Sequence, residues 1–131
     1  MLVQGMSVRV GIVGMGYWGP NLARNMATLE GCELAWCCEL DDEKTRHWES
    51  AYPQATFTSD IEDLLGDPDL SAVVVATPGS THAAVGERVL EAGKNCFIEK
   101  PLAHDTASAA RLVQLAQRDG ELALARRDRE L

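Results

Sequence analysis

The sequence predicts an α/β fold built on an open, doubly wound and mostly parallel sheet. Apolar segments with strand spacing alternate along the chain with segments of helical spacing, and short connections separate them. Residues 71–76 are apolar on both alternating faces, as a central strand covered by helices on both sides requires. With 131 residues the chain suffices for one domain and is too short for a closed α/β barrel, which takes about 250 residues.

In the first half of the chain, turn and capping residues separate the expected elements. Pro20 suits the first turn of a helix, Gly31 suits a helix end, and Asp41 or Asp42 suits the start of the next helix. We therefore expect a strand at 7–13, a helix from Pro20 to Gly31, a strand at 33–39, a helix at 41–50, a short strand at 55–57 and a helix from 59 or 60 to Gly66.

The second half continues the same alternation. Val85, Val89 and Leu90 share one face of a helical segment that Gly93 would end. The expected elements are a strand at 71–76, a helix at 81–92, a strand at 95–98, a helix at 105–118 with Leu112 and Leu115 facing inward, and a further strand within 121–125. Right-handed crossovers between such units give a doubly wound sheet.

Composition excludes several classes of function. The chain has 12 Lys and Arg against 20 Asp and Glu, a net charge of −8, so it lacks the basic excess that binds nucleic acid. Its apolar runs are much shorter than the roughly 20 residues that cross a bilayer, and residues 1–13 lack the pattern of a secretion signal. We expect a cytoplasmic protein with no nucleic-acid partner and no membrane partner.

The cysteines show no pattern typical of a metal site or a disulfide. Cys32, Cys37, Cys38 and Cys96 have no paired C-x-x-C spacing. The neighbours Cys37 and Cys38 would point to opposite faces of an extended strand. We therefore expect no metal, no disulfide, and reduced thiols with a structural role.

A glycine-rich turn lies between the first expected strand and the first expected helix. In this G-x-G-x-x-G pattern the first glycine allows a sharp turn, the second lets a pyrophosphate approach the backbone, and the third lets the helix pack closely on the strand. Unpaired N–H groups and the positive end of the helix would hold the anion. The residues expected around a dinucleotide pyrophosphate are Gly14, Met15, Gly16, Tyr17, Trp18 and Gly19.

An acidic residue stands where a ribose would be recognised. Glu39 lies 20 residues after Gly19, at the end of the second expected strand. A carboxylate there accepts hydrogen bonds from ribose hydroxyls and repels a 2′-phosphate, which favours NAD over NADP, although the cations Lys44 and Arg46 are near. A turn that only packs, with Glu39 as a solvated strand end, is the alternative.

Three motifs in order carry a resemblance to a known family. They are the glycine turn extended by Pro20-Asn21, the segment from Ala76-Thr77-Pro78 to Thr81-His82, and Glu99-Lys100-Pro101-Leu102-Ala103. Together they resemble the N-terminal, Rossmann-type NAD(P)-binding domain of the Gfo/Idh/MocA oxidoreductases, from about Val8 to Gly120. The Gly-Tyr-Trp-Gly-Pro-Asn form of the turn is most similar to members that act on nucleotide sugars.

The resemblance implies roles for residues in the second and third motifs. It places Lys100 beside the nicotinamide, where an ammonium would stabilise the developing charge or relay the proton of the reacting hydroxyl. It also implies that Thr77 and Pro78 line the cofactor and that His82 and Glu99 lie on the cofactor side. A surface lysine, and a histidine that only caps or packs, are the alternative interpretations.

The chain also departs from the family pattern. Family members are typically more than twice as long and carry a second α/β domain that binds substrate, and that domain is absent from this sequence. We expect a dinucleotide-binding domain at residues 1–125 and a charged tail at 126–131, a pattern that a truncated or frameshifted reading would give. Little turnover by this chain alone is then expected, and uncovered apolar surface would favour a homo-oligomer.

The sequence therefore leads to one main hypothesis and two alternatives. The first is an NAD-dependent oxidoreductase domain for hydride transfer to or from a sugar or nucleotide-sugar hydroxyl, with a small-molecule substrate if a substrate domain completes it. The second is a dinucleotide-binding module, a sensor or a subunit, with no catalysis of its own. The third is a structural or interaction protein with a vestigial glycine turn.

Overall fold

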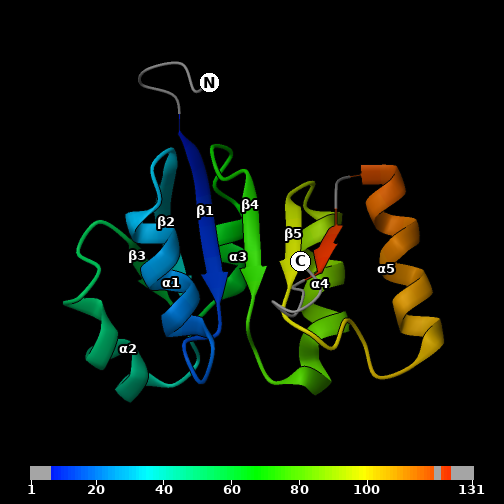
Figure 1. Cartoon of the computed structure of the whole chain (residues 1–131), viewed down its shortest axis with the longest axis horizontal. Coiled ribbons are helices and arrows are strands. Elements are labelled where there is room, and N and C mark those ends of the chain that lie inside the picture. Colours follow the sequence, from blue (N-terminus) through cyan, green and yellow to red (C-terminus); the bar gives the residue numbers. More distant parts are fainter. Residues whose placement is uncertain (1–6, 120–121, 125–131) are drawn as a thin grey trace.

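A six-stranded parallel sheet forms the middle layer of the computed structural model, which describes residues 7–119 and 122–124 (Figure 1). The strand order is β3-β2-β1-β4-β5-β6, the order typical of dinucleotide-binding folds. The predicted α/β, doubly wound architecture is confirmed. The strands are β1 Val8–Val13, β2 Cys32–Cys38, β3 Thr56–Thr58, β4 Ala72–Val75, β5 Asn95–Ile98 and β6 Leu122–Leu124.

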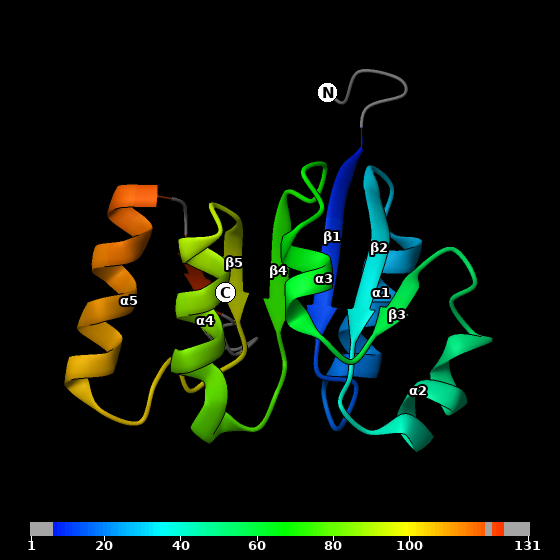
Figure 2. The ribbon, with the colours of Figure 1, turned by 180° about the vertical axis from the view of Figure 1, so that it is seen from behind.

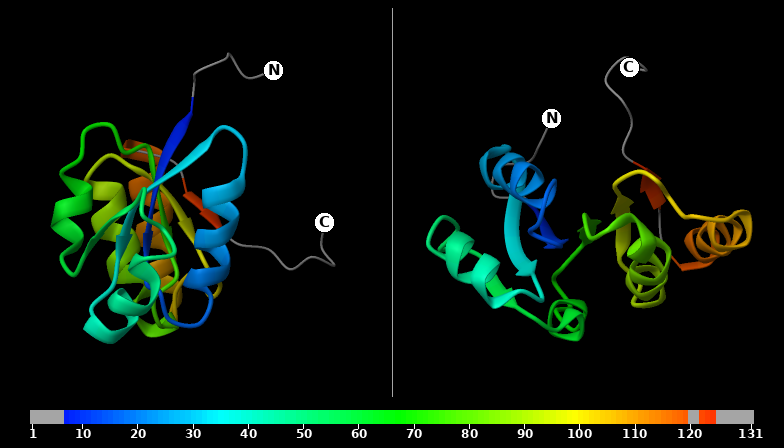
Figure 3. Two further views of the ribbon diagram at one scale, coloured as in Figure 1. Left: turned by 90° about the vertical axis from the view of Figure 1, so that its left-hand side faces the viewer. Right: turned by 90° about the horizontal axis from the view of Figure 1, so that it is seen from below.

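Helices cover both faces of this sheet. Figure 1 shows α1 in front of the strands, and the reverse view in Figure 2 shows α3 and α4 in front. The edge-on view in Figure 3 shows the two helical layers on either side of the sheet. The helices are α1 Gly19–Thr28, α2 Asp42–Glu49, α3 Ile61–Leu65, α4 His82–Glu91 and α5 Thr106–Asp119, with a short 3-10 turn, η1 Gly79–Thr81, before α4.

Each face of the sheet has its own apolar core. Val74 of β4 packs with Ile12 and with Ala23 of α1, and its neighbours Val73 and Val75 pack into the opposite core with α3, α4 and α5. The expectation that β4 is a central strand, apolar on both faces, is confirmed by its pairing with β1 and β5. This arrangement fixes the ends of β1 and β4 side by side.

The cysteines occupy these cores as free thiols. Cys37 lies in the α1-side core and Cys38 in the opposite one, so the expected alternation is confirmed. Burial raises the pKa of Cys37 and of Cys96 to about 12. For Cys38, burial and then the nearby carboxylates, Glu39 first, raise the pKa to about 11. Thiols with such pKa values are protonated and unreactive at neutral pH.

Some element boundaries differ from the sequence expectation. The helix α1 ends at Thr28 instead of Gly31, so Leu29 lies beyond it and is exposed. Gly31 instead makes the turn into β2, with φ of 82°. The last expected strand is present as β6, whereas the boundary at residue 125 and the expected tail at 126–131 lie outside the described residues.

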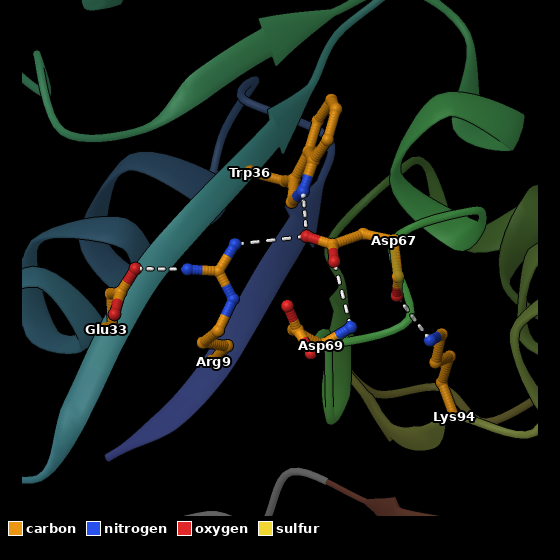
Figure 4. Close-up of polar contacts among 6 residues, drawn as sticks. All are labelled: Arg9, Glu33, Trp36, Asp67, Asp69 and Lys94. Atoms are coloured by element: carbon orange, nitrogen blue, oxygen red, sulfur yellow. Dashed lines mark hydrogen bonds and ion pairs between the residues drawn. The ribbon is translucent and has the colours of Figure 1, made fainter. Parts of the chain in front are cut away.

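A partly buried polar cluster around Asp67 holds the amino-terminal edge of the sheet together (Figure 4). The Asp67 carboxylate accepts hydrogen bonds from Trp36 Nε1 at 2.9 Å and from the Arg9 guanidinium at 3.0 Å. Arg9 also pairs with Glu33 on β2. The buried Lys94 donates to the Asp67 carbonyl oxygen at 2.7 Å. These contacts join β1, β2 and the segments that lead into β4 and β5.

Asp67 should make stability depend on pH. The hydrogen bond from Trp36 is the main cause that lowers the pKa of Asp67 to about 2, followed by the Asp69 amide; Arg9 adds to the effect. Because the folded-state pKa lies below the ordinary value of 3.8, this stabilisation is complete above about pH 4 and is lost as the pH falls toward 2.

Asp67→Asn should lower the free energy of unfolding at pH 7 by about 1–2 kcal/mol, as measured by urea titration. Below pH 4 the free energy of unfolding of this variant should depend less on pH than that of the parent chain.

The exposed neighbour provides the matched control for this change. Asp69→Asn removes an exposed carboxylate from a residue that contacts Asp67 through its backbone amide, so its effect should stay within about 0.5 kcal/mol. Equal destabilisation by the two variants would contradict the role assigned to the Asp67 carboxylate.

Candidate functional site

The carboxyl ends of the central strands open into one cavity of about 1000 Å³. It lies at the edge of the sheet opposite the Asp67 cluster, where the chain leaves β1 and β4 in opposite directions, the position at which open α/β sheets bind ligands. Most sequence-predicted site residues line it: Gly14, Gly16, Tyr17, Trp18, Glu39, Thr77, Pro78, His82, Glu99 and Lys100. The remaining two, Met15 and Gly19, lie outside this lining.

The three glycines of the first turn have three different surroundings. A Cβ on Gly14, whose φ is 100°, would lie 2.7 Å from the backbone of Ala76. A Cβ on Gly19 would lie 1.8 Å from the carbonyl oxygen of Gly14, so α1 starts directly against the end of β1. At Gly16 the nearest atom would be the Lys44 ammonium at 3.7 Å, which leaves open space over the backbone.

The start of α1 has hydrogen-bond capacity that no side chain uses. Its N-cap, Trp18, makes no side-chain capping bond, Pro20 occupies the first turn, and that turn contains no acidic residue. By contrast, Asp41 caps α2 by accepting a hydrogen bond from the Glu43 amide. The first N–H groups of a helix lack partners within the helix and carry its positive end, so α1 can bind an anion at the cavity.

Glu39 is fixed at the rim of the cavity by the main chain. Its Oε1 accepts the Met15 amide at 2.7 Å, and its Oε2 accepts the Asp41 amide at 2.9 Å. Each carboxylate oxygen can accept a further hydrogen bond, so the group can still bind hydroxyls. Met15 itself has a buried side chain in the α1-side core, 1% exposed, so it contributes to the site through its backbone.

The cavity also contains residues that the sequence reasoning did not single out. Leu40, which follows Glu39, is 82% exposed and lines the cavity, as does Ile61. An apolar residue at a strand end next to the acid was the available signal for Leu40. Tyr17 is 83% exposed and stands edge to face with Trp18, the ring centroids 5.1 Å apart.

Two turns form the other side of the cavity. Thr77 and Pro78 follow β4, and Thr81 closes this turn by bonding Thr77 Oγ1 at 2.6 Å. Glu99, Lys100 and Pro101 follow β5, and Lys100 is exposed in the cavity next to a cis peptide bond. The ammonium of Lys100 and the carboxylates of Glu99 and Glu39 are therefore the charged groups that the sequence predicted for this cavity.

His82 lies between these two turns. Its side chain is buried, and its ring nitrogens lie 2.7 Å from the carbonyl oxygens of Thr77 and Pro101. Both nitrogens are thus engaged by the main chain, while the residue still lines the cavity as expected for the cofactor side.

Within residues 7–119 and 122–124, no three His, Cys, Asp or Glu side chains come together as a metal site would require. No helix in the same part of the chain is long and apolar enough to span a membrane.

Comparison with known proteins identifies related domains. Residues 8–126 match the family model described as oxidoreductase family, NAD-binding Rossmann fold, Gfo/Idh/MocA. Inositol 2-dehydrogenase of Acidothermus cellulolyticus is 34% identical over 115 residues, 87% of this chain and 34% of its own length. Inositol 2-dehydrogenase 1 of Saccharopolyspora erythraea is 37% identical over 110 residues, 82% of this chain and 33% of its own. The chain spans about a third of the length of these curated relatives.

Solved structures share the fold over almost the whole chain. GenD2 from gentamicin A biosynthesis, in complex with NAD, superposes with a TM-score of 0.88 at 29% identity, covering 95% of this chain and 36% of that one. Biliverdin reductase from Synechocystis, in complex with biliverdin and NADP+, superposes with a TM-score of 0.83 at 30% identity, covering 89% of this chain and 37% of that one.

Because Gly16 and Gly19 have different surroundings, an alanine at each position should change the free energy of unfolding by a different amount. Gly19→Ala places a methyl group against the carbonyl oxygen of Gly14. It should lower the free energy of unfolding by at least about 3 kcal/mol, or prevent folding. In Gly16→Ala the added methyl group would meet only the flexible Lys44 ammonium, at an ordinary contact distance of 3.7 Å, so the free energy of unfolding should stay within about 1 kcal/mol of the parent chain. Urea unfolding followed by circular dichroism measures both, and similar midpoints for the two variants would contradict this packing.

Proposed function

The chain belongs to the Gfo/Idh/MocA oxidoreductase family, and we propose that its NAD-binding domain serves hydride transfer to or from a hydroxyl carbon of a polyol, sugar or nucleotide sugar. One observation carries the proposal. The fold brings the open glycine turn, the fixed acid Glu39 and the exposed Lys100 to one cavity, although they are far apart in sequence. Such a cavity can hold an extended dinucleotide with its reactive end near a cation.

The residues present fit a dinucleotide. The space over Gly16 leaves room for a pyrophosphate against bare backbone, where the uncapped start of α1 supplies N–H donors. Glu39 can accept hydrogen bonds from the adenosine ribose, and its negative charge opposes a 2′-phosphate, so NAD fits better than NADP. Thr77 and Pro78 would then flank the nicotinamide half.

Lys100 is the residue proposed to act in the chemistry. NAD, when bound, supplies the hydride acceptor, and oxidation of a carbinol also releases the hydroxyl proton. The Lys100 ammonium can stabilise the negative charge that develops on the substrate oxygen, and it can relay the proton by releasing one of its own to solvent as it takes up the hydroxyl proton. Its exposure in the cavity leaves it accessible to a substrate.

The substrate class rests on the relatives and on the aromatic pair. The inositol 2-dehydrogenases, by name, act on a cyclic polyol, which supports a polyhydroxylated substrate. Tyr17 and Trp18 present exposed rings beside the cavity, and such rings can stack on a nucleobase or on a sugar face. This arrangement supports a nucleotide sugar as the finer assignment.

A dinucleotide-binding module without its own catalysis is the second candidate function. The observation that favours it is the lining of the cavity, in which the glycine turn, Glu39 and Thr77 fit a dinucleotide and only Lys100 is proposed to act in chemistry. In this case a separate substrate-binding subunit would have to orient the reactant, because orientation contributes much of the rate of hydride transfer.

NADH titration tests the function that the two candidates share. Protein fluorescence and NADH fluorescence should saturate below about 1 mM cofactor, the range in which such enzymes bind. Turnover with NAD on myo-inositol or on UDP-N-acetylglucosamine would favour the oxidoreductase, and binding without turnover would favour the module. Failure to bind NADH at millimolar concentration would contradict both.

Glu39 should determine both affinity and cofactor preference. Glu39→Ala removes the ribose acceptor and should raise the Kd for NADH about tenfold, while the Kd for NADPH stays unchanged or falls. Isothermal titration calorimetry measures both constants. Glu43→Ala makes the same charge change on the exposed side of α2 and serves as the control. An equal loss of NADH and NADPH affinity in Glu39→Ala would contradict the role in discrimination.

A further inference from the structure

One buried side chain connects the two turns that follow β4 and β5. The His82 ring is 2% exposed, with Nε2 at 2.7 Å from the Thr77 carbonyl oxygen and Nδ1 at 2.7 Å from the Pro101 carbonyl oxygen. An imidazole ring donates from one nitrogen when it is neutral and from both nitrogens when both carry a proton. The residue therefore bridges two main-chain segments that are not adjacent in sequence.

These contacts place Lys100 between two fixed points. On one side, the Glu99 amide donates to the Val75 carbonyl oxygen at 3.0 Å, which continues the pairing of β5 with β4. On the other side, the Pro101 carbonyl oxygen lies against His82. The backbone of Lys100 is thus held before and after the residue, while its side chain is free to reach into the cavity.

His82 is itself held firmly by the packing of α4, which it begins. A Cβ on Gly86 would lie 2.7 Å from Ile98 on β5 and 3.0 Å from Leu112 on α5, so the helix approaches both elements very closely. Before it, Thr81 bonds both the Thr77 hydroxyl and the Pro78 carbonyl oxygen at 2.6 Å. The ring therefore has a rigid base from which to hold the two turns.

We propose that His82 is a positioning residue, which orders the Glu99–Pro101 turn and so directs Lys100 toward the nicotinamide side of the cavity. This inference rests on the proposed role of Lys100 and extends it to a second residue. His82 acts through backbone, because both of its nitrogens face carbonyl oxygens. A neutral imidazole carries one N–H and donates to one carbonyl at a time, and both bonds form when both nitrogens carry a proton.

Backbone dynamics test this role without any cofactor. In His82→Phe, a ring of similar size fills the site but donates no hydrogen bond, so the Thr77 and Pro101 carbonyl groups lose their partner. Relaxation of 15N amides should show the order parameters of Lys100 and Leu102 falling from about 0.85 toward 0.6, while β1 stays rigid. His82→Gln keeps a donor and should retain more order than His82→Phe.

Two further measurements keep the inference testable. Asp67→Asn, which acts at the opposite edge of the sheet, is the control for general destabilisation and should leave the order of Lys100 unchanged. Should His82→Phe fail to fold, couplings across hydrogen bonds in the unmodified chain, from the His82 ring to the Thr77 and Pro101 carbonyl carbons, test the bridge directly. Unchanged order in His82→Phe, an equal loss of order in β1, or the absence of both couplings would overturn the inference.

Ligand binding then links this role to the proposed function. Bound NADH would reach the two turns with its nicotinamide end, whereas ADP has the adenosine and both phosphates but no nicotinamide. His82→Phe should therefore raise the Kd for NADH about tenfold and change the Kd for ADP less than about twofold. An equal rise for the two ligands would indicate a merely structural histidine and overturn the inference. If the unmodified chain binds neither ligand, the proposed function fails, while the order parameters still decide whether His82 positions Lys100.

Discussion

The contact between Gly19 and the carbonyl oxygen of Gly14 is the constraint on which the site depends. No side chain separates the first turn of α1 from the end of β1, since a Cβ there would lie only 1.8 Å from that oxygen. This approach aims the unpaired N–H groups of α1 at the cavity and turns the Met15 side chain into the core. The Met15 amide then meets Glu39, so the same turn also fixes the acid at the end of β2.

Polar groups gather at both edges of the parallel sheet, the one where the strands begin and the one where they end, and the two groups have different roles. At the amino edge, the Arg9 guanidinium pairs with the Asp67 carboxylate through one terminal nitrogen while its buried Nε has no hydrogen-bond partner, and Lys94 donates to the Asp67 carbonyl oxygen. These contacts join the strands at this edge. At the carboxyl edge, Lys44 and Lys100 line the cavity, and Glu39 keeps acceptor capacity for a ligand. A chain with net charge −8 thus places two of its few cations where an anionic cofactor would lie.

The sequence predicted elements well wherever a local signal had one physical meaning. The apolar run of β4 needed burial on both faces, and Asp41 capped α2 as its side chain suggested. It did less well where the deciding contact was distant. Leu29 has the spacing of the α1 core residues, yet the turn toward β2 begins before it, and nothing local to it reveals this. Met15 lies within the glycine motif, but its buried side chain leaves only its amide for the site.

The order of strands and helices and the glycine turn with its acid followed from the sequence, because spacing and residue type are local properties. Lys100 was identified as the candidate cation through the resemblance that its Glu-Lys-Pro motif carries. Which of these groups meet depends on the tertiary fold. It tied Glu39 to the turn through Met15, placed Lys44 over Gly16, and enclosed His82 between the Thr77 and Pro101 carbonyl groups. Such contacts join residues that share no pattern, since they arise from strands laid side by side and from the close packing of helices upon them.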